Sequence, residues 1–131
     1  RLAINSNSCV NAPTQWAGIA ALTGPQDAVA EMTAAFDRRR RLLMELIAEI
    51  PQLSCVEPKG AFYAFPNISA TGLKAKQLEV ELLEQAGVAT IAGTSFGIHG
   101  EGYLRFSYAT SEEQLREALA RIGAHLAKRR G

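Results

Sequence analysis

The sequence predicts an α/β fold in which helices pack on a small sheet of about four strands, with a long helix preceding the sheet. Two observations support this prediction. In several segments, apolar residues recur at three- and four-residue steps, which is the period of an amphipathic helix. Between these segments lie short apolar runs bounded by glycine and proline, which is typical of strands. The resulting order of elements is that of helices layered on one sheet.

The first residues are expected to be mostly irregular. Residues 1–12 are polar and carry no helix start, and the chain begins without an initiator methionine. We therefore expect a fragment or a trimmed product of a longer protein. A short helix is predicted over residues 13–22, with Asn11 as its N-cap and Gly24 followed by Pro25 at its end.

A long amphipathic helix is predicted from Gln26 to Ile50, where Pro51 stops it. The run Arg38–Arg41 lies inside this helix. At roughly 100° per residue, four successive side chains cover most of the helix circumference. At least one of these arginines should therefore lie along apolar surface or pair with a carboxylate, and Asp37 lies four residues before Arg41. A phosphate or nucleic-acid role for the run is the alternative.

Two short apolar segments, Leu53–Val56 and Ala61–Phe65, are predicted to be strands. The residues between them include Pro58 and Gly60, which favour a turn. Residues 67–72 are expected to form a loop.

The remainder of the chain is predicted to form helix, two strands and helix. A helix over residues 74–85 should end at Gly87, and a strand should cover residues 88–92. The last helix has two alternative capping boxes, either Thr110 with Glu113 or Ser111 with Gln114. Its buried stripe is expected to consist of apolar residues at helical spacing: Leu115, Leu119, Ile122 and Leu126.

The segment from Gly93 to Ala109 contains the main candidate for a binding residue, Arg105. This arginine lies in an apolar strand, where side chains alternate between two faces. Leu104 and its alternate neighbours should face the core, so Arg105 should face a polar space. A guanidinium offers planar donors that match a carboxylate, and burying it is costly without an anion. The alternative is a structural arginine on an edge strand, paired with a nearby Asp or Glu.

Composition restricts the class of protein. The 131 residues are 47% hydrophobic and fit one domain with a real core. Fourteen basic and 13 acidic residues leave a net charge of +1, which argues against a nucleic-acid surface. No segment resembles a membrane span or a signal peptide, and no metal site is expected. Cys9 and Cys55 are interpreted as reduced, buried thiols of a cytoplasmic protein.

Several motifs fall into one family pattern. Pro58–Pro66 (PKGAFYAFP), Ala86–Gly97 (AGVATIAGTSFG) and Gly100–Ile122 (GEGYLRFSYATSEEQLREALARI) closely resemble fold-type-I pyridoxal-phosphate aminotransferases of class I/II, in the aspartate aminotransferase superfamily. Ser6–Leu22 resembles the segment that follows the cofactor-binding region in that family. The resemblance covers the whole chain and corresponds to roughly the last third of a typical member.

The resemblance implies an enzyme that moves an amino group between an amino acid and a 2-oxo acid, with pyridoxal 5'-phosphate as cofactor and a homodimer as assembly. Residues 1–24 would be the end of the large domain, and residues 25–131 the small domain. Arg105 would bind the substrate α-carboxylate. Phe62, Tyr63 and Phe96 would lie at the pocket edge, with core packing as the alternative for each.

The same resemblance leaves this chain without a catalytic residue. The family's Schiff-base lysine stands in a Ser-x-x-Lys motif, which none of the four lysines matches: Lys59, Lys74, Lys76 and Lys128. The chain alone is therefore not expected to be active or to bind the cofactor covalently. Two alternatives remain, the small domain of a fold-type-I C–S lyase or synthase and a non-catalytic carboxylate-binding or dimerisation module.

Overall fold

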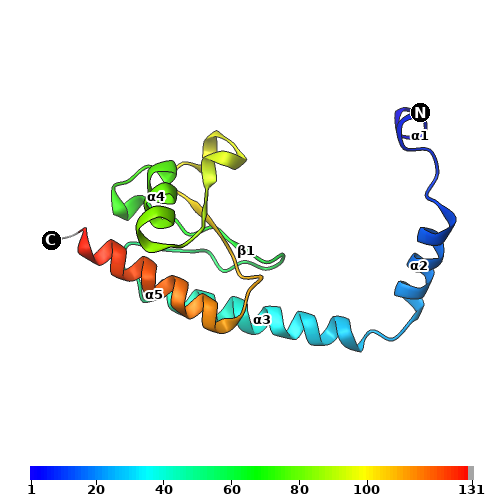
Figure 1. Ribbon diagram of the computed structural model, residues 1–131, viewed down its shortest axis with the longest axis horizontal. Coiled ribbons are helices and arrows are strands. Elements are labelled where there is room, and N and C mark those ends of the chain that lie inside the picture. Colours follow the sequence, from blue (N-terminus) through cyan, green and yellow to red (C-terminus); the bar gives the residue numbers. More distant parts are fainter. Residues whose placement is uncertain (130–131) are drawn as a thin grey trace. The chain divides into compact units, whose positions relative to one another are not determined.

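The computed structural model describes residues 1–129, apart from the side chain of Ile4, and divides the chain into two compact units. The first unit is Arg1–Thr33 and the second begins at Ala34. The boundary predicted between residues 24 and 25 separates two domains of a larger protein, and it stays a prediction. Figure 1 shows both units, coloured along the sequence.

The predicted short helix of the first unit is confirmed as α2 (Ala12–Thr23). The Asn11 side chain accepts a hydrogen bond from the Thr14 backbone N–H at 2.9 Å, so Asn11 is the N-cap. Gly24 ends the helix, with its N–H bonded to the Ala20 carbonyl. The local signals for this helix were therefore sufficient.

The prediction that residues 1–12 are irregular is wrong for α1 (Leu2–Asn7). Local backbone bonds close this helix, among them Asn5 N–H to Arg1 C=O at 3.1 Å. Ser8 follows with a left-handed φ of 53°. Bonds of this kind need neither an apolar stripe nor a side-chain cap, so nothing in the polar sequence signals the helix.

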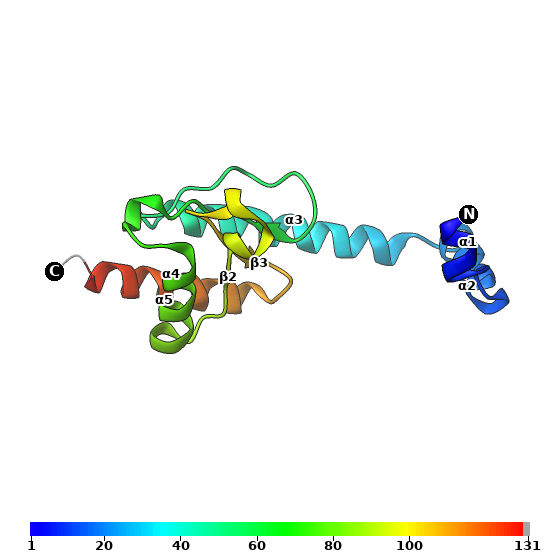
Figure 2. The same ribbon diagram turned by 90° about the horizontal axis from the view of Figure 1, so that it is seen from above.

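The second unit contains a three-stranded antiparallel sheet with the order β1-β3-β2. Its strands are β1 (Tyr63–Ala64), β2 (Ile91–Ala92) and β3 (Leu104–Ser107). The predicted α/β class is confirmed, with three strands instead of about four. Figure 2 shows this small sheet beside the helices.

The strand predicted over Leu53–Val56 is wrong. The Leu53 N–H donates to the Ile50 carbonyl at 2.9 Å, so a turn after the long helix uses the start of the segment. Only Ser54 then pairs, in an isolated bridge with Asn67. The expectation of buried thiols also needs correction, because Cys9 is exposed in the segment between the first two helices and Cys55 is half-buried.

Helices supply most of the core around the sheet. The long helix is α3 (Asp27–Ala48), and α4 (Ala75–Glu81) continues into a π-helical turn, η2 (Leu82–Ala86). Gly87 ends that turn with a left-handed φ of 65°. The last helix, α5 (Glu112–Lys128), lies with the C-terminal half of α3 on one side of the sheet (Figure 1).

The predicted buried stripe of α5 is confirmed in full, and all four of its residues are less than 5% exposed. Of the two capping alternatives, the structure uses Ser111, whose hydroxyl accepts from the Gln114 N–H at 3.3 Å. The strand alternation is confirmed as well. Leu104, Phe106 and Tyr108 are buried in the core, and Arg105 lies on the other face of the sheet.

Candidate functional site

Arg105 lies in the central strand of the sheet, not at its edge. In the antiparallel ladder Ile91 of β2 stands opposite Arg105, and β1 pairs with the other side of β3. The alternative of an edge-strand arginine is therefore wrong. A central strand is held on both sides, so it fixes the direction of the arginine side chain more firmly than an edge strand would.

Two aromatic rings flank the Arg105 guanidinium. Its Cζ atom lies 4.3 Å from the centre of the Tyr63 ring and 4.5 Å from the centre of the Phe96 ring. Tyr63 stands opposite Ser107, so it is the diagonal neighbour of Arg105 across the strands. Ring faces attract a cation electrostatically and leave the in-plane N–H donors uncovered.

The guanidinium has no carboxylate partner within residues 1–129, where it makes neither an ion pair nor a hydrogen bond. The alternative of a structural arginine paired with Asp or Glu therefore has no support in this part of the chain. A half-buried cation held only by rings retains its donors for an anion from elsewhere. The site thus offers a planar, positively charged fork.

A tight turn places Phe96 against Arg105. The turn leaves β2 at Gly93, whose N–H donates to the Tyr103 carbonyl at 2.8 Å. A Cβ atom on Gly93 would lie 2.2 Å from the carbonyl oxygen of Gly100, and one on Gly100 would lie 2.0 Å from that of Gly93. Only glycine permits this close approach of two backbone segments.

Phe62, the third predicted pocket-edge residue, lies elsewhere. Its ring stacks on Phe36 of α3 with centres 6.0 Å apart, and Tyr108 meets the same Phe36 ring edge-on at 6.3 Å. The Phe62 ring lies beside that of its neighbour Tyr63, with 4.4 Å between ring centres. The structure therefore brings Tyr63 and Phe96 to Arg105 and places Phe62 in an aromatic cluster with α3.

An ion-pair network anchors the segment that leads to Tyr63. Arg40 of α3 pairs with Asp37 at 2.7 Å and also with Glu57, which in turn pairs with Lys59 at 2.9 Å. The Arg40 guanidinium lowers the pKa of Asp37, and the hydrogen bonds from Lys59 and Arg40 lower the pKa of Glu57. Of the four consecutive arginines, Arg40 is therefore the one whose burial is compensated by carboxylates, as predicted for at least one of them.

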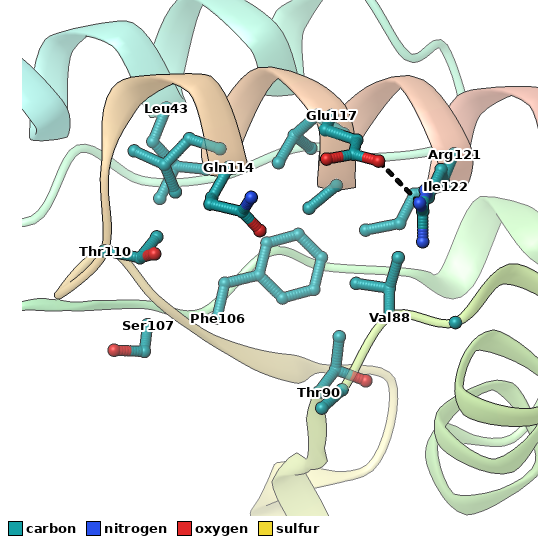
Figure 3. Close-up of a pocket in the computed structure, with 15 residues that line it drawn as sticks. Leu43, Val88, Thr90, Phe106, Ser107, Thr110, Gln114, Glu117, Arg121 and Ile122 are labelled. Carbon is teal, nitrogen blue, oxygen red and sulfur yellow. Dashed lines mark hydrogen bonds and ion pairs between the residues drawn. The ribbon is translucent and has the colours of Figure 1, made fainter.

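A cavity of about 380 Å³ lies outside the Arg105 site, between α5 and the sheet (Figure 3). Phe106 forms part of its wall, and the ion pair between Glu117 and Arg121 lies at one side. The Thr90 hydroxyl on its lining is buried without a hydrogen-bond partner among the described residues. The two charged side chains on this lining, Glu117 and Arg121, pair with each other, so the Arg105 guanidinium is the better candidate for a functional site.

Within residues 1–129, no group of three or more His, Cys, Asp and Glu side chains is placed to hold a metal ion. In the same residues, no helix combines the length and the apolar character needed to cross a membrane.

Comparisons with known proteins agree on one family. The family model of aminotransferase class I and II matches residues 2–122. The chain is 48% identical over 110 residues to an aspartate aminotransferase of Pyrococcus horikoshii, covering 82% of this chain and 28% of that protein. It is 47% identical over 120 residues to the putative aminotransferase YugH of Bacillus subtilis, covering 92% of this chain and 31% of the relative.

Solved structures give the same result. The chain superimposes on the aromatic aminotransferase of Pyrococcus horikoshii with a TM-score of 0.91 and 40% identity, covering 98% of this chain and 35% of that one. The aspartate aminotransferase of Rhizobium meliloti gives a TM-score of 0.84 at 37% identity, covering 96% of this chain and 34% of that one. The chain thus spans about a third of the length of the proteins it matches.

The residues present do not fit the pyridoxal phosphate that such proteins use. An amine that bonds to this cofactor must be sheltered and directed into a pocket, and all four lysines of the chain are exposed. Lys59 pairs with Glu57, and Lys76 pairs with Glu79 at 2.8 Å. No lysine lies against the Arg105 guanidinium among its described contacts.

Proposed function

The chain belongs to the aminotransferase class I and II family, and on this premise we propose that it forms the C-terminal part of a pyridoxal-phosphate-dependent aminotransferase. In that enzyme an amino group passes between an amino acid and a 2-oxo acid, and Arg105 binds the α-carboxylate that both substrates share. We also infer a cytoplasmic homodimer, in which residues 1–24 continue the large domain and residues 25–131 form the small domain.

One observation supports this role above the others: Arg105 is a half-buried cation whose described partners are two aromatic rings. The Arg105 Cζ atom lies over both rings, 4.3 Å from the centre of Tyr63 and 4.5 Å from the centre of Phe96. A carboxylate accepts two parallel hydrogen bonds from such a fork, which fixes its orientation as well as its position. A single point charge would attract the substrate without orienting it.

Orientation is the contribution of this chain to the reaction. When bound, pyridoxal phosphate supplies the electron sink for the chemistry at the substrate's α-carbon. The alignment of that carbon depends on how the carboxylate is held, and misplacing a substrate by about 1 Å costs on the order of 100-fold in rate. Because its lysines do not fit the cofactor, the 131-residue chain by itself is expected to show no transamination.

The proposal is tested by Arg105→Lys in the complete aminotransferase that contains this chain. Lysine retains the charge and loses the planar fork, so KM for an amino acid and for a 2-oxo acid should both rise by about tenfold or more. Arg116→Lys is the matched control, since Arg116 is exposed on α5. Unchanged KM values in Arg105→Lys would remove Arg105 from the binding site.

A second measurement tests the cofactor part of the proposal. Pyridoxal phosphate added to the isolated chain should leave, after borohydride reduction, only labelling that is spread over several amines, because the chain offers exposed lysines and none that a pocket favours. A single stoichiometric adduct detected by mass spectrometry would show that one of these lysines attaches the cofactor after all.

A further inference from the structure

Tyr108 lies next to the candidate site in sequence but on the opposite face of the sheet. It follows β3 directly, is 1% exposed, and its ring meets Phe36 of α3 edge-on. A buried tyrosine carries a hydroxyl that needs a hydrogen-bond partner, and a phenylalanine would fill the same space without that requirement. Packing alone therefore accounts for the ring of Tyr108 but not for its hydroxyl.

Tyr108 makes two hydrogen bonds to consecutive peptide groups of the segment before β1. Its hydroxyl donates to the Ala61 carbonyl at 2.9 Å, and its backbone N–H donates to the Phe62 carbonyl, also at 2.9 Å. Burial raises the pKa of Tyr108, so the hydroxyl keeps its proton and remains a donor. One residue thus fixes two successive carbonyl groups.

The conformation that these bonds hold is unusual. Ala61 has a φ of 58°, in the left-handed region, where the Cβ atom of a residue lies too close to the following carbonyl oxygen. Such a conformation persists only where the surrounding structure over-determines it. The two bonds from Tyr108 provide this restraint at Ala61 itself and at the next residue, Phe62.

The held segment leads directly to the ring that stacks on Arg105. Tyr63 follows Phe62, stands opposite Ser107, and lies with its ring centre 4.3 Å from the guanidinium carbon. Strand β1 is only two residues long, so its ladder offers little to fix the direction in which the chain enters it. The backbone at residues 61 and 62 sets that direction.

We propose that Tyr108 is a positioning residue for Arg105, whose hydroxyl fixes the backbone at Ala61 and Phe62 and thereby sets the Tyr63 ring under the guanidinium. The inference rests on the proposed carboxylate-binding function of Arg105 and deepens it. Tyr108 touches neither substrate nor cofactor in this scheme. It acts across the sheet, from the buried face to the face that carries the guanidinium.

Tyr108→Phe tests the proposal, because it removes the hydroxyl and keeps the ring in the core. The variant should fold, since Ala61 is exposed and water can replace the lost donor at its carbonyl. Tyr103→Phe is the matched control: it also removes one tyrosine hydroxyl, and that hydroxyl has no hydrogen-bond partner within residues 1–129.

The first readout is nuclear magnetic resonance of the isolated chain. Ring currents from Tyr63 and Phe96 shift the Arg105 Nε–H signal, because both rings lie against the guanidinium. Tyr108→Phe should move this signal toward its position in Tyr63→Leu, and Tyr103→Phe should leave it unmoved. A role in stability alone would lower the melting temperature and leave the signal of the folded chain in place.

The second readout is kinetics of the complete enzyme. Tyr108→Phe should lower kcat/KM for carboxylate substrates about fivefold, mostly by raising KM. This factor corresponds to the net free energy that one hydrogen bond contributes. In an Arg105→Lys background, Tyr108→Phe should add no further loss, because it acts through the fork that lysine lacks.

The outcomes separate the two proposals. If Arg105→Lys raises KM and Tyr108→Phe changes neither KM nor the Nε–H signal, the role of Tyr108 is overturned and that of Arg105 stands. The positioning role of Tyr108 is also overturned if Tyr108→Phe lowers kcat/KM by the same factor in the Arg105→Lys background as in the wild type. If Arg105→Lys leaves KM unchanged, the carboxylate-binding proposal fails, and the positioning role fails with it.

Discussion

The Glu101 carboxylate accepts a hydrogen bond from the backbone N–H of Ala75 at 2.8 Å, and so caps helix α4 from a loop 26 residues further along the chain. The residue at the usual capping position, Lys74, makes no side-chain cap. Glu101 also accepts from the Gly102 N–H at 3.1 Å, and these two bonds lower its pKa. One carboxylate therefore connects the turn behind Phe96 to the start of α4.

Glu101→Ala should lower the melting temperature of the chain by a few degrees, because it leaves the Ala75 N–H at the start of α4 without its acceptor. Glu101→Gln should lose less, since its amide oxygen can still accept both bonds. Thermal unfolding followed by circular dichroism measures the difference. Equal melting temperatures for wild type and Glu101→Ala would show that water caps the helix as well as Glu101 does.

Gly100→Ala should destabilise the turn that carries Phe96. The added Cβ would lie 2.0 Å from the Gly93 carbonyl oxygen, and backbone on both sides must move to relieve the clash. We expect a loss of about 1–3 kcal/mol in urea unfolding, as for other overpacked sites. Gly60→Ala is the control, because Gly60 lies outside the helices and nothing lies within 4 Å of the position of its Cβ. A tolerated Gly100→Ala would mean that the two segments approach less closely.

Sequence patterns predicted correctly those features that depend on interactions between residues close together in the chain. The two-residue period of β3 predicted which face Arg105 occupies, and the helical period predicted the buried stripe of α5. Asn11 was predicted as a cap, and Ser111 as one of two alternatives, because a cap bonds to a backbone group only three residues away. The strand over residues 53–56 failed because a turn, made by a bond back to Ile50, competes for its first residue.

The partners of Arg105 depend on register, which no local pattern contains. Tyr63 and Phe96 were candidates for the pocket edge together with Phe62, and the structure sets two of the three against the guanidinium. The pairing of Tyr63 with Ser107 across the strands places the first ring, and the turn that begins at Gly93 places the second. Their place at a substrate pocket stays a prediction.

The contacts across the sheet were missed for the same reason. Tyr108 and Ala61 lie 47 residues apart, and nothing in either residue type announces the bond between the hydroxyl and the carbonyl. The structure itself marks this position, because Ala61 has a left-handed φ that is uncommon for a residue other than glycine.

Stability should depend on acid through the Arg40 network. The pKa values of Asp37 and Glu57 are lowered in the folded chain, so their contribution is complete above the ordinary carboxyl pKa of about 4 and is lost as pH falls through the lowered values. Glu57→Gln should therefore lower the melting temperature at pH 7 and do so progressively less on acidification. Glu45→Gln is the control, as Glu45 has no ion pair within residues 1–129. A difference between wild type and Glu57→Gln that stays constant from pH 7 to about pH 3 would contradict this.

Gly123→Ala should stabilise the chain. Gly123 lies inside α5, where glycine is about 0.5–1 kcal/mol less favourable than alanine. The new Cβ would meet the Ile50 side chain at 3.6 Å, an ordinary van der Waals distance, so it adds apolar contact without a clash. Gly87→Ala is the same change at a left-handed position, φ 65°, and should destabilise. Urea unfolding of the two variants should therefore give shifts of opposite sign, and a loss of stability in Gly123→Ala would show that α5 and Ile50 lie closer together than the structure places them.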